Sequence, residues 1–216
     1  MRLRDPDTLD PSLSYLNDAI INPIGRMIQC EAGSDVLVFS TQLTQALLSP
    51  LPDAEAQLER RQRLCRAFAG EDIFSKRLLL FPFIEGVKLS GGMTAEHIFA
   101  VAVFPQTKVV VAVDSIGAAK AHALNLVRAF LQVEYHEASD GTPGPFDWTG
   151  WRTASLCKRT PAQTDGSSCG VYALLAMRAL ARRVSLGRVL VAQRICGTPS
   201  YWRRRLAFWL TIGKII

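Results

Sequence analysis

Two almost wholly apolar segments joined by a short turn place the strongest constraint on the fold of this chain. Residues 97–104 read HIFAVAVF, residues 109–113 read VVVAV, and four residues beginning with Pro105 separate them. Runs rich in β-branched and aromatic residues, with so short a connection, predict a β-hairpin. Because neither run alternates with polar residues, we expect the hairpin in the centre of a sheet that is covered on both faces.

Helices and shorter strands are predicted on either side of this hairpin. Helical spacing of apolar residues predicts a first helix from Asp10 to Ile28, with a kink at Pro23. Further helices are predicted over residues 40–48, 53–69, 118–134, 169–183 and 199–210, and further strands over 36–39, 78–84 (broken by Pro82) and 152–157, with loops at 86–92 and 139–150. This order favours an α+β fold with a central, mostly antiparallel sheet flanked by helices.

Composition and charge limit the class of protein. A chain of 216 residues with 49% hydrophobic and 20% charged residues fits a single domain and excludes a disordered, collagenous or coiled-coil protein. Of its net charge of +6, the whole positive excess lies in residues 151–216, which contain a single acidic residue, Asp165. This basic C-terminal third suggests either a face for an acidic partner or nucleic acid, or a solvated arginine-rich surface.

The cysteines and the N-terminus bear on cofactors and location. The five cysteines form no CxxC or CxxH pair, so we expect neither a zinc site nor a disulfide framework, and no other metal or cofactor. The first residues lack the apolar core of a secretory signal, and no apolar run approaches the ~18 residues of a membrane span. We therefore expect an intracellular protein of the nucleus or cytoplasm, not secreted and not bound to a membrane.

Cys169 is the candidate nucleophile. It follows the sequence DGSS at the start of a predicted helix, where the helix dipole favours a thiolate. Backbone N–H groups at a helix N-terminus are also suited to bind an oxyanion. Gly170 would let a substrate backbone approach closely. The alternative is a buried structural cysteine after a serine-rich turn.

A thiolate nucleophile needs a base and a group that orients the base. His97 begins the first strand of the hairpin and Asp114 follows the second, so pairing of these strands brings the two side chains near each other. Gln163 precedes Cys169 by six residues, and its amide can complete an oxyanion hole. The alternatives are a structural histidine at a strand edge and an aspartate that caps the next helix.

In their order along the chain, these residues resemble the Ulp/sentrin-specific cysteine protease family, which cleaves SUMO and related ubiquitin-like proteins. The resemblance covers roughly residues 13–216. The similar blocks are Tyr15–Asn22, Leu78–Ile84, His97–Val103, Val113–Ser115, Gln163–Tyr172, Arg203–Ala207 and Gly213–Ile215. No single block is decisive, but the ordered set is specific.

The resemblance implies a papain-like cysteine protease fold, in one catalytic domain over residues 1–216. We also expect a flexible N-terminus over residues 1–12 and a monomeric protein. The resemblance also implies the roles of the site residues. The catalytic set is His97 as base, Asp114 as its orienting acid, Cys169 as nucleophile and Gln163 at the oxyanion hole. The substrate-binding set is Tyr15, Asp18, Ile98 and Gly170.

Four positions depart from the family pattern. Ile98 replaces the Trp that follows the catalytic His, and Tyr15 stands where the first helix usually carries Trp. In SUMO proteases these two aromatic residues form a tunnel for a Gly-Gly tail, so a Tyr/Ile pair implies a less enclosed clamp. Ser168 replaces an Asp before Cys-Gly, and Ala162 replaces a common residue before Gln163.

The function expected from this pattern is a thiol peptidase or isopeptidase that cleaves ubiquitin-like modifier conjugates or precursors through a Cys-His-Asp triad. Two alternatives stay open at the level of sequence. One is an acetyltransferase of related triad architecture, and the other is a catalytically weak module that binds a ubiquitin-like protein.

Overall fold

The computed structural model describes most, but not all, of the chain. The described residues are 16–48, 59, 72–88, 94–116, 120–138, 146–155, 163, 165–185 and 198–216. The predicted helix over residues 53–69 (apart from residue 59), the N-terminal segment 1–12, Tyr15 and Ala162 lie outside the described residues.

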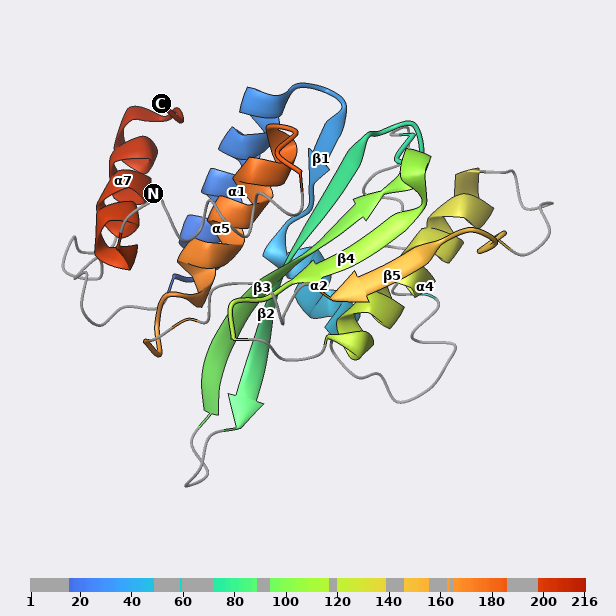
Figure 1. Ribbon diagram of the computed structural model, residues 1–216, viewed down its shortest axis with the longest axis horizontal. Helices are drawn as coiled ribbons and strands as arrows, with labels where there is room; N and C mark the ends of the chain where they lie inside the picture. Colours follow the sequence, from blue (N-terminus) through green and yellow to red (C-terminus); the bar gives the residue numbers. More distant parts are fainter. Residues whose placement is uncertain are drawn as a thin grey trace.

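A five-stranded sheet in the order β1-β2-β3-β4-β5 forms the centre of the fold (Figure 1). Its strands are β1 (Val36–Val38), β2 (Leu78–Lys88), β3 (Thr94–Phe104), β4 (Val109–Val113) and β5 (Arg152–Ser155). The long central pairings β2–β3 and β3–β4 are antiparallel, whereas both edge pairings are parallel. The predicted central hairpin is confirmed: β3 and β4 are joined by the short 3₁₀ helix η2 (Pro105–Thr107) and by Lys108 in a left-handed conformation.

Strand β2 is longer than the sequence predicts. It continues through Pro82 to Lys88, so the break expected at Pro82 and the loop expected from Gly86 are wrong for the part that the structure describes. Proline lacks an N–H and is excluded from a strand that is paired on both sides. Here β1 pairs with β2 only as far as Leu80, so Pro82 lies beyond the end of that pairing. The Pro82 carbonyl still accepts a hydrogen bond, from Thr44 Oγ1.

Five helices are described. They are α1 (Asp18–Ala32), α2 (Thr41–Leu48), α4 (Ala121–Ala138), α5 (Cys169–Ala181) and α7 (Pro199–Ile212). The first helix was expected from Asp10, but Leu16 and Asn17 are not helical and Asn17 is the N-cap of α1. Ser40 precedes α2 as predicted, and its hydroxyl accepts a hydrogen bond from the Leu43 N–H at 3.3 Å. None of the helices in the described part of the chain is long and apolar enough to cross a membrane.

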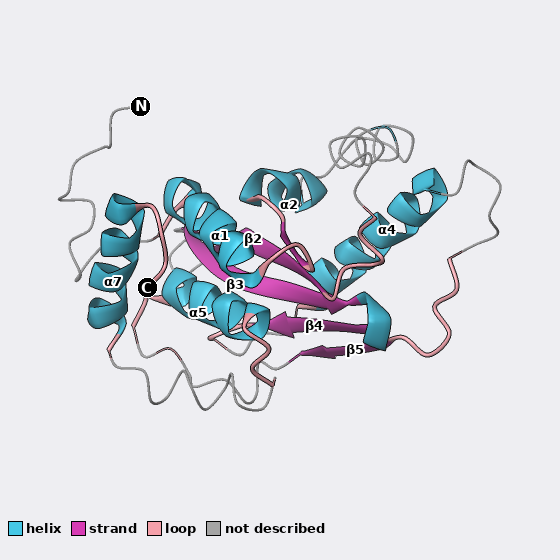
Figure 2. Ribbon diagram, turned by 90° about the horizontal axis from the view of Figure 1, so that it is seen from above, coloured by secondary structure: helices cyan, strands magenta, loops and turns pink. Residues whose placement is uncertain are grey.

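The helices cover both faces of the sheet, as the apolar hairpin predicted. Figure 1 shows α1 and α5 side by side on one face with α7 outside them, and Figure 2 shows the same layers from above. Successive residues of β3 divide between the two layers, since strand side chains alternate. Ile98 and Ala100 join the core under α1, α5 and α7, while Phe99 and Val101 join the core under α2 and α4.

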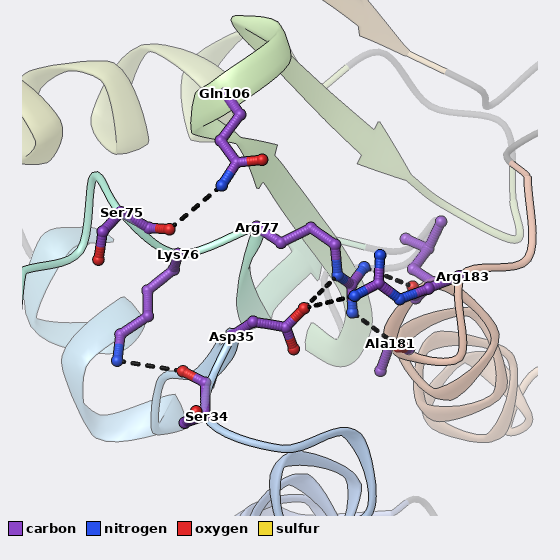
Figure 3. Close-up of polar contacts among 9 residues, drawn as sticks. Ser34, Asp35, Ser75, Lys76, Arg77, Gln106, Ala181 and Arg183 are labelled. Carbon is purple, nitrogen blue, oxygen red and sulfur yellow. Dashed lines mark hydrogen bonds and ion pairs between the residues drawn. The ribbon is translucent and has the colours of Figure 1, made fainter.

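A polar cluster fixes the C-terminal end of α5 to the start of the sheet (Figure 3). Asp35 Oδ2 accepts hydrogen bonds from Arg77 Nε at 2.7 Å and from Arg183 Nη2 at 2.9 Å. Arg77 Nη2 also donates to the Ala181 carbonyl at 2.9 Å, at the end of α5. The hydrogen bond and charge of Arg77, together with the charge of Arg183, outweigh desolvation and lower the pKa of Asp35. Arg183 itself has a left-handed backbone, with φ of 63°.

Candidate active site

The structure brings His97 and Asp114 together, as the hairpin predicted. His97 Nε2 lies 2.7 Å from Asp114 Oδ1, and both side chains are almost fully buried. The last residue pair between β3 and β4 is Ala100 with Val113. His97 therefore lies on the part of β3 that extends past the end of β4, and Asp114 follows β4 directly. Asp114 Oδ1 also accepts a hydrogen bond from the Ile116 N–H at 3.1 Å.

Cys169 lies at the N-terminus of α5, near this pair. It is 2% exposed, and it is one of the groups that act on the pKa of His97. The His97 imidazole is bonded to the Asp114 carboxylate through Nε2, and Cys169 is within its electrostatic reach.

The charges at this site favour a protonated imidazole. Burial lowers the pKa of His97, but the hydrogen bond to Asp114 and the electrostatic interactions with Asp114 and Cys169 outweigh burial and raise this pKa to about 9. Burial likewise raises the pKa of Asp114, but the His97 and Ile116 hydrogen bonds and the nearby positive charges outweigh it, so this pKa is lowered. His97 is therefore an imidazolium, and Asp114 a carboxylate, at neutral pH.

A buried lysine adjoins Asp114, and the sequence reasoning missed it. Lys120 is 6% exposed, and its Nζ lies 3.5 Å from Asp114 Oδ2 and 2.9 Å from Glu85 Oε2. The same ammonium lies 4.3 Å from the centre of the Phe99 ring, which stacks with His97. The sequence signal that could have found Lys120 is its position just before a helix. The helix dipole disfavours a cation there, so a nearby carboxylate is expected to stabilise it.

Gln163 lies between the segment that follows β4 and the turn before Cys169. Its N–H donates to the Ser115 carbonyl at 2.9 Å, and its Oε1 accepts a hydrogen bond from Ser115 Oγ at 2.9 Å. Its side-chain amide N–H donates to the Asp165 carbonyl. Gln163 is therefore tied to the residue that follows Asp114, with its amide directed at the turn that leads to the nucleophile.

The residues expected to contact substrate differ in their exposure. Asp18 is exposed in the first turn of α1, where its carboxylate accepts a hydrogen bond from Gln42 Nε2 at 3.4 Å. Ile98 is 0% exposed and Gly170 is buried. A Cβ on Gly170 would come within 2.9 Å of Leu16 Cβ and 3.1 Å of Ile98 Cδ1. Close packing therefore favours glycine at residue 170.

The described cysteines and acids offer no metal centre. Cys30 and Cys169 are free thiols, the first exposed and the second buried. Within the described ranges, no three His, Cys, Asp or Glu side chains lie close enough together to hold a metal ion. The chemistry that this arrangement can perform is nucleophilic attack by a thiolate beside an imidazolium.

Comparison with known proteins identifies a cysteine protease family. Residues 14–195 match the model of the Ulp1 protease family, C-terminal catalytic domain. Comparison with curated protein sequences found no match.

Several of the solved structures with a similar fold are described as SUMO proteases. The C-terminal Ulp1 protease domain in complex with Smt3, the yeast ortholog of SUMO, has a TM-score of 0.64 and 19% identity over 97% of this chain and 82% of that one. A de-sumoylating protease has a TM-score of 0.68 and 15% identity over 96% and 83%. The catalytic domain of the Chaetomium thermophilum Ulp1-like SUMO protease has a TM-score of 0.59 and 19% identity over 95% and 75%. These likenesses confirm the expected fold.

Proposed function

Since the chain belongs to the Ulp1 protease family and is a cysteine peptidase, we propose that it cleaves conjugates or precursors of a ubiquitin-like modifier through Cys169, His97 and Asp114. The observation that carries this proposal is the 2.7 Å contact of His97 Nε2 with Asp114 Oδ1, with the pKa of His97 raised to about 9 by a set of groups that includes Cys169. An imidazolium that persists at neutral pH is the partner that a thiolate nucleophile requires.

Each residue then has a defined role. The Cys169 thiolate attacks the carbonyl carbon of the scissile bond, and His97 donates its proton to the leaving amine. The imidazole next accepts a proton from the water that attacks the acyl-enzyme, so that water releases the carboxylate product and restores the thiol. Asp114 keeps the ring oriented and stabilises its charged form.

The oxyanion of each tetrahedral intermediate needs hydrogen-bond donors. The first turn of α5 supplies backbone N–H groups that have no partner within the helix. The Gln163 amide donates to the Asp165 carbonyl in this structure. For Gln163 to donate to the oxyanion, its amide must therefore turn from that carbonyl when substrate binds.

The similar structures guide the choice of substrate. The solved Ulp1 domain is described in complex with the yeast ortholog of SUMO. In this chain Ile98 is buried, and Tyr15 lies outside the described residues. We propose that exposed residues such as Asp18 contact the folded body of the modifier, and that a panel of modifiers, including SUMO and ubiquitin, identifies the preferred one.

The direct test uses the Cys169→Ala variant. Wild type should release a C-terminal extension or a lysine-linked conjugate from at least one modifier of the panel, and Cys169→Ala should release none. Cys30→Ala is the matched control, because Cys30 is also a free thiol but exposed on α1, and it should retain wild-type activity. Equal cleavage by wild type and Cys169→Ala would refute the proposal.

Incubation with labelled acetyl-CoA tests the acetyltransferase alternative. We expect no acetyl group on Cys169.

A further inference from the structure

The turn that leads to Cys169 is fixed from within by one carboxylate. Asp165 Oδ1 accepts hydrogen bonds from the N–H groups of Ser167 at 2.9 Å and Ser168 at 2.8 Å. Asp165 is also the single acidic residue of the basic C-terminal third. Its carboxylate thus shapes the backbone immediately before the nucleophile.

A second group holds the same turn from outside. Arg203, on α7, is 3% exposed, and its Nη2 donates to the Ser167 carbonyl at 2.6 Å and approaches Ser167 Oγ at 3.3 Å. Helix α7 brings this guanidinium inward because Leu206 and Trp209 are buried in the same core as Cys169. In the run of three arginines from residue 203, the next residue, Arg204, is exposed.

The charge of Arg203 also acts on the site. Burial lowers the pKa of Arg203, whereas the charges of Asp165 and Cys169 raise it. A guanidinium stays protonated in proteins even when it is buried. The permanently charged guanidinium of Arg203 therefore lies within electrostatic reach of Cys169. It is supplied by α7, which follows α5 in the chain.

We propose that Arg203 is a positioning residue for Cys169, which fixes the turn through the Ser167 carbonyl and favours the thiolate through its charge. The inference rests on the proposed function, because it assigns a role within the same site. Two contributions are separable. The hydrogen bonds from Arg203 Nη2 to Ser167 position the turn, and the positive charge stabilises the thiolate–imidazolium pair.

Three variants separate these contributions. In Arg203→Gln both are lost, so we expect kcat to fall about 10- to 100-fold with KM nearly unchanged, because a nucleophile displaced by even 1 Å reacts slowly. The acid limb of the kcat/KM profile should also move up by about one pH unit, since the ion pair forms less readily. Arg203→Lys keeps the charge, so we expect the acid limb to stay in place while kcat still falls about tenfold. Arg204→Gln is the matched control and should behave as wild type.

A second readout does not depend on any protein substrate. Alkylation of Cys169 by iodoacetamide, followed on the peptide that contains Cys169 by mass spectrometry, should show the same shift of the acid limb in Arg203→Gln. If no modifier is cleaved but this shift is present, the proposed function fails and the role of Arg203 stands.

The role of Arg203 is overturned if a folded Arg203→Gln keeps the wild-type kcat and acid limb. It is also overturned if the variant only unfolds at lower urea concentration, with its acid limb in place, because that is the result of a merely structural arginine. Should Arg203→Gln fail to fold, Arg203→Lys decides: a wild-type kcat in this variant excludes the positioning role.

Discussion

At the scale of single residues, the site contains buried charges that alternate in sign. His97 and Lys120 are cations, and Asp114 lies between them, 2.7 Å from His97 and 3.5 Å from Lys120. Burying one charge alone is costly, and removing one member of such a group leaves the others uncompensated. Asp114 thus lies between two positive groups, and the charges of both contribute to the lowering of its pKa.

Asp114→Asn should move the alkaline limb of the pH–activity profile. The carboxylate helps to raise the pKa of His97 to about 9, so its loss lowers this pKa and the imidazolium disappears at a lower pH. We expect the alkaline limb of kcat/KM to shift to lower pH, and kcat to fall by about 10²-fold or more. Asp147→Asn, at an exposed aspartate, is the control. An alkaline limb that stays in place would show that Asp114 does not set the charge of His97.

At the scale of elements, α5 is held at both of its ends. Its N-terminus carries Cys169, and the carbonyl of Ala181 at its C-terminus accepts a hydrogen bond from Arg77. Past this end, the chain turns through Arg183 in a left-handed conformation, and the Val184 N–H bonds to the Ala179 carbonyl at 2.9 Å. Glycine usually occupies this position after a helix.

The left-handed backbone at Arg183 predicts that glycine is more stabilising than alanine at residue 183, and that the order is reversed at residue 182. Arg183→Gly should be more stable than Arg183→Ala by about 1 kcal/mol, because only glycine adopts φ of 63° without strain. The 71% exposed Arg183 side chain is lost in both variants, so its weak ion pair cancels. At Arg182, where φ is −80°, Ala should be the more stable choice. Urea unfolding of the four variants measures both differences, and the same sign at both positions would contradict the argument.

Most of these elements follow from local sequence, and the exceptions have physical causes. The hairpin and the pairing of His97 with Asp114 were predictable because short turns fix which residues meet. The course of β2 through Pro82 was not, because it depends on where β1 ends. The close packing of Gly170 depends on Leu16 and Ile98, neighbours that no local pattern reveals.

At the scale of the whole molecule, ion pairs within the fold partly neutralise the uneven charge along the sequence. Arg178 donates to Glu31 through Nε and Nη2, both at 3.1 Å, and Arg183 pairs with Asp35 at 2.9 Å. The basic C-terminal third thus meets acids from the first 50 residues. The sequence left open a face for an acidic partner or nucleic acid, or a solvated arginine-rich surface, because charge counts do not show which residues become neighbours.

Glu31→Gln should weaken the fold in a manner that depends on salt. Its partner Arg178 is 14% exposed and lies over the Trp209 ring at 4.6 Å. We expect the free energy of unfolding to fall by about 1 kcal/mol at low ionic strength, and by less in high salt, because the pair is partly screened. The control is Glu96→Gln, at an exposed acid on β3. A loss that is the same at all salt concentrations would rule out an ionic origin.

The separation of the site residues along the chain also sets the order in which the site assembles. His97 and Asp114 are 17 residues apart and meet within one hairpin, which makes theirs a contact of short sequence separation. Cys169 joins them from a later helix, and Arg203 fixes that helix from an element that follows it. During synthesis, these residues therefore leave the ribosome in the order His97, Asp114, Cys169 and Arg203. The contact between Arg203 and the turn before Cys169 can form only after α7 has been synthesised.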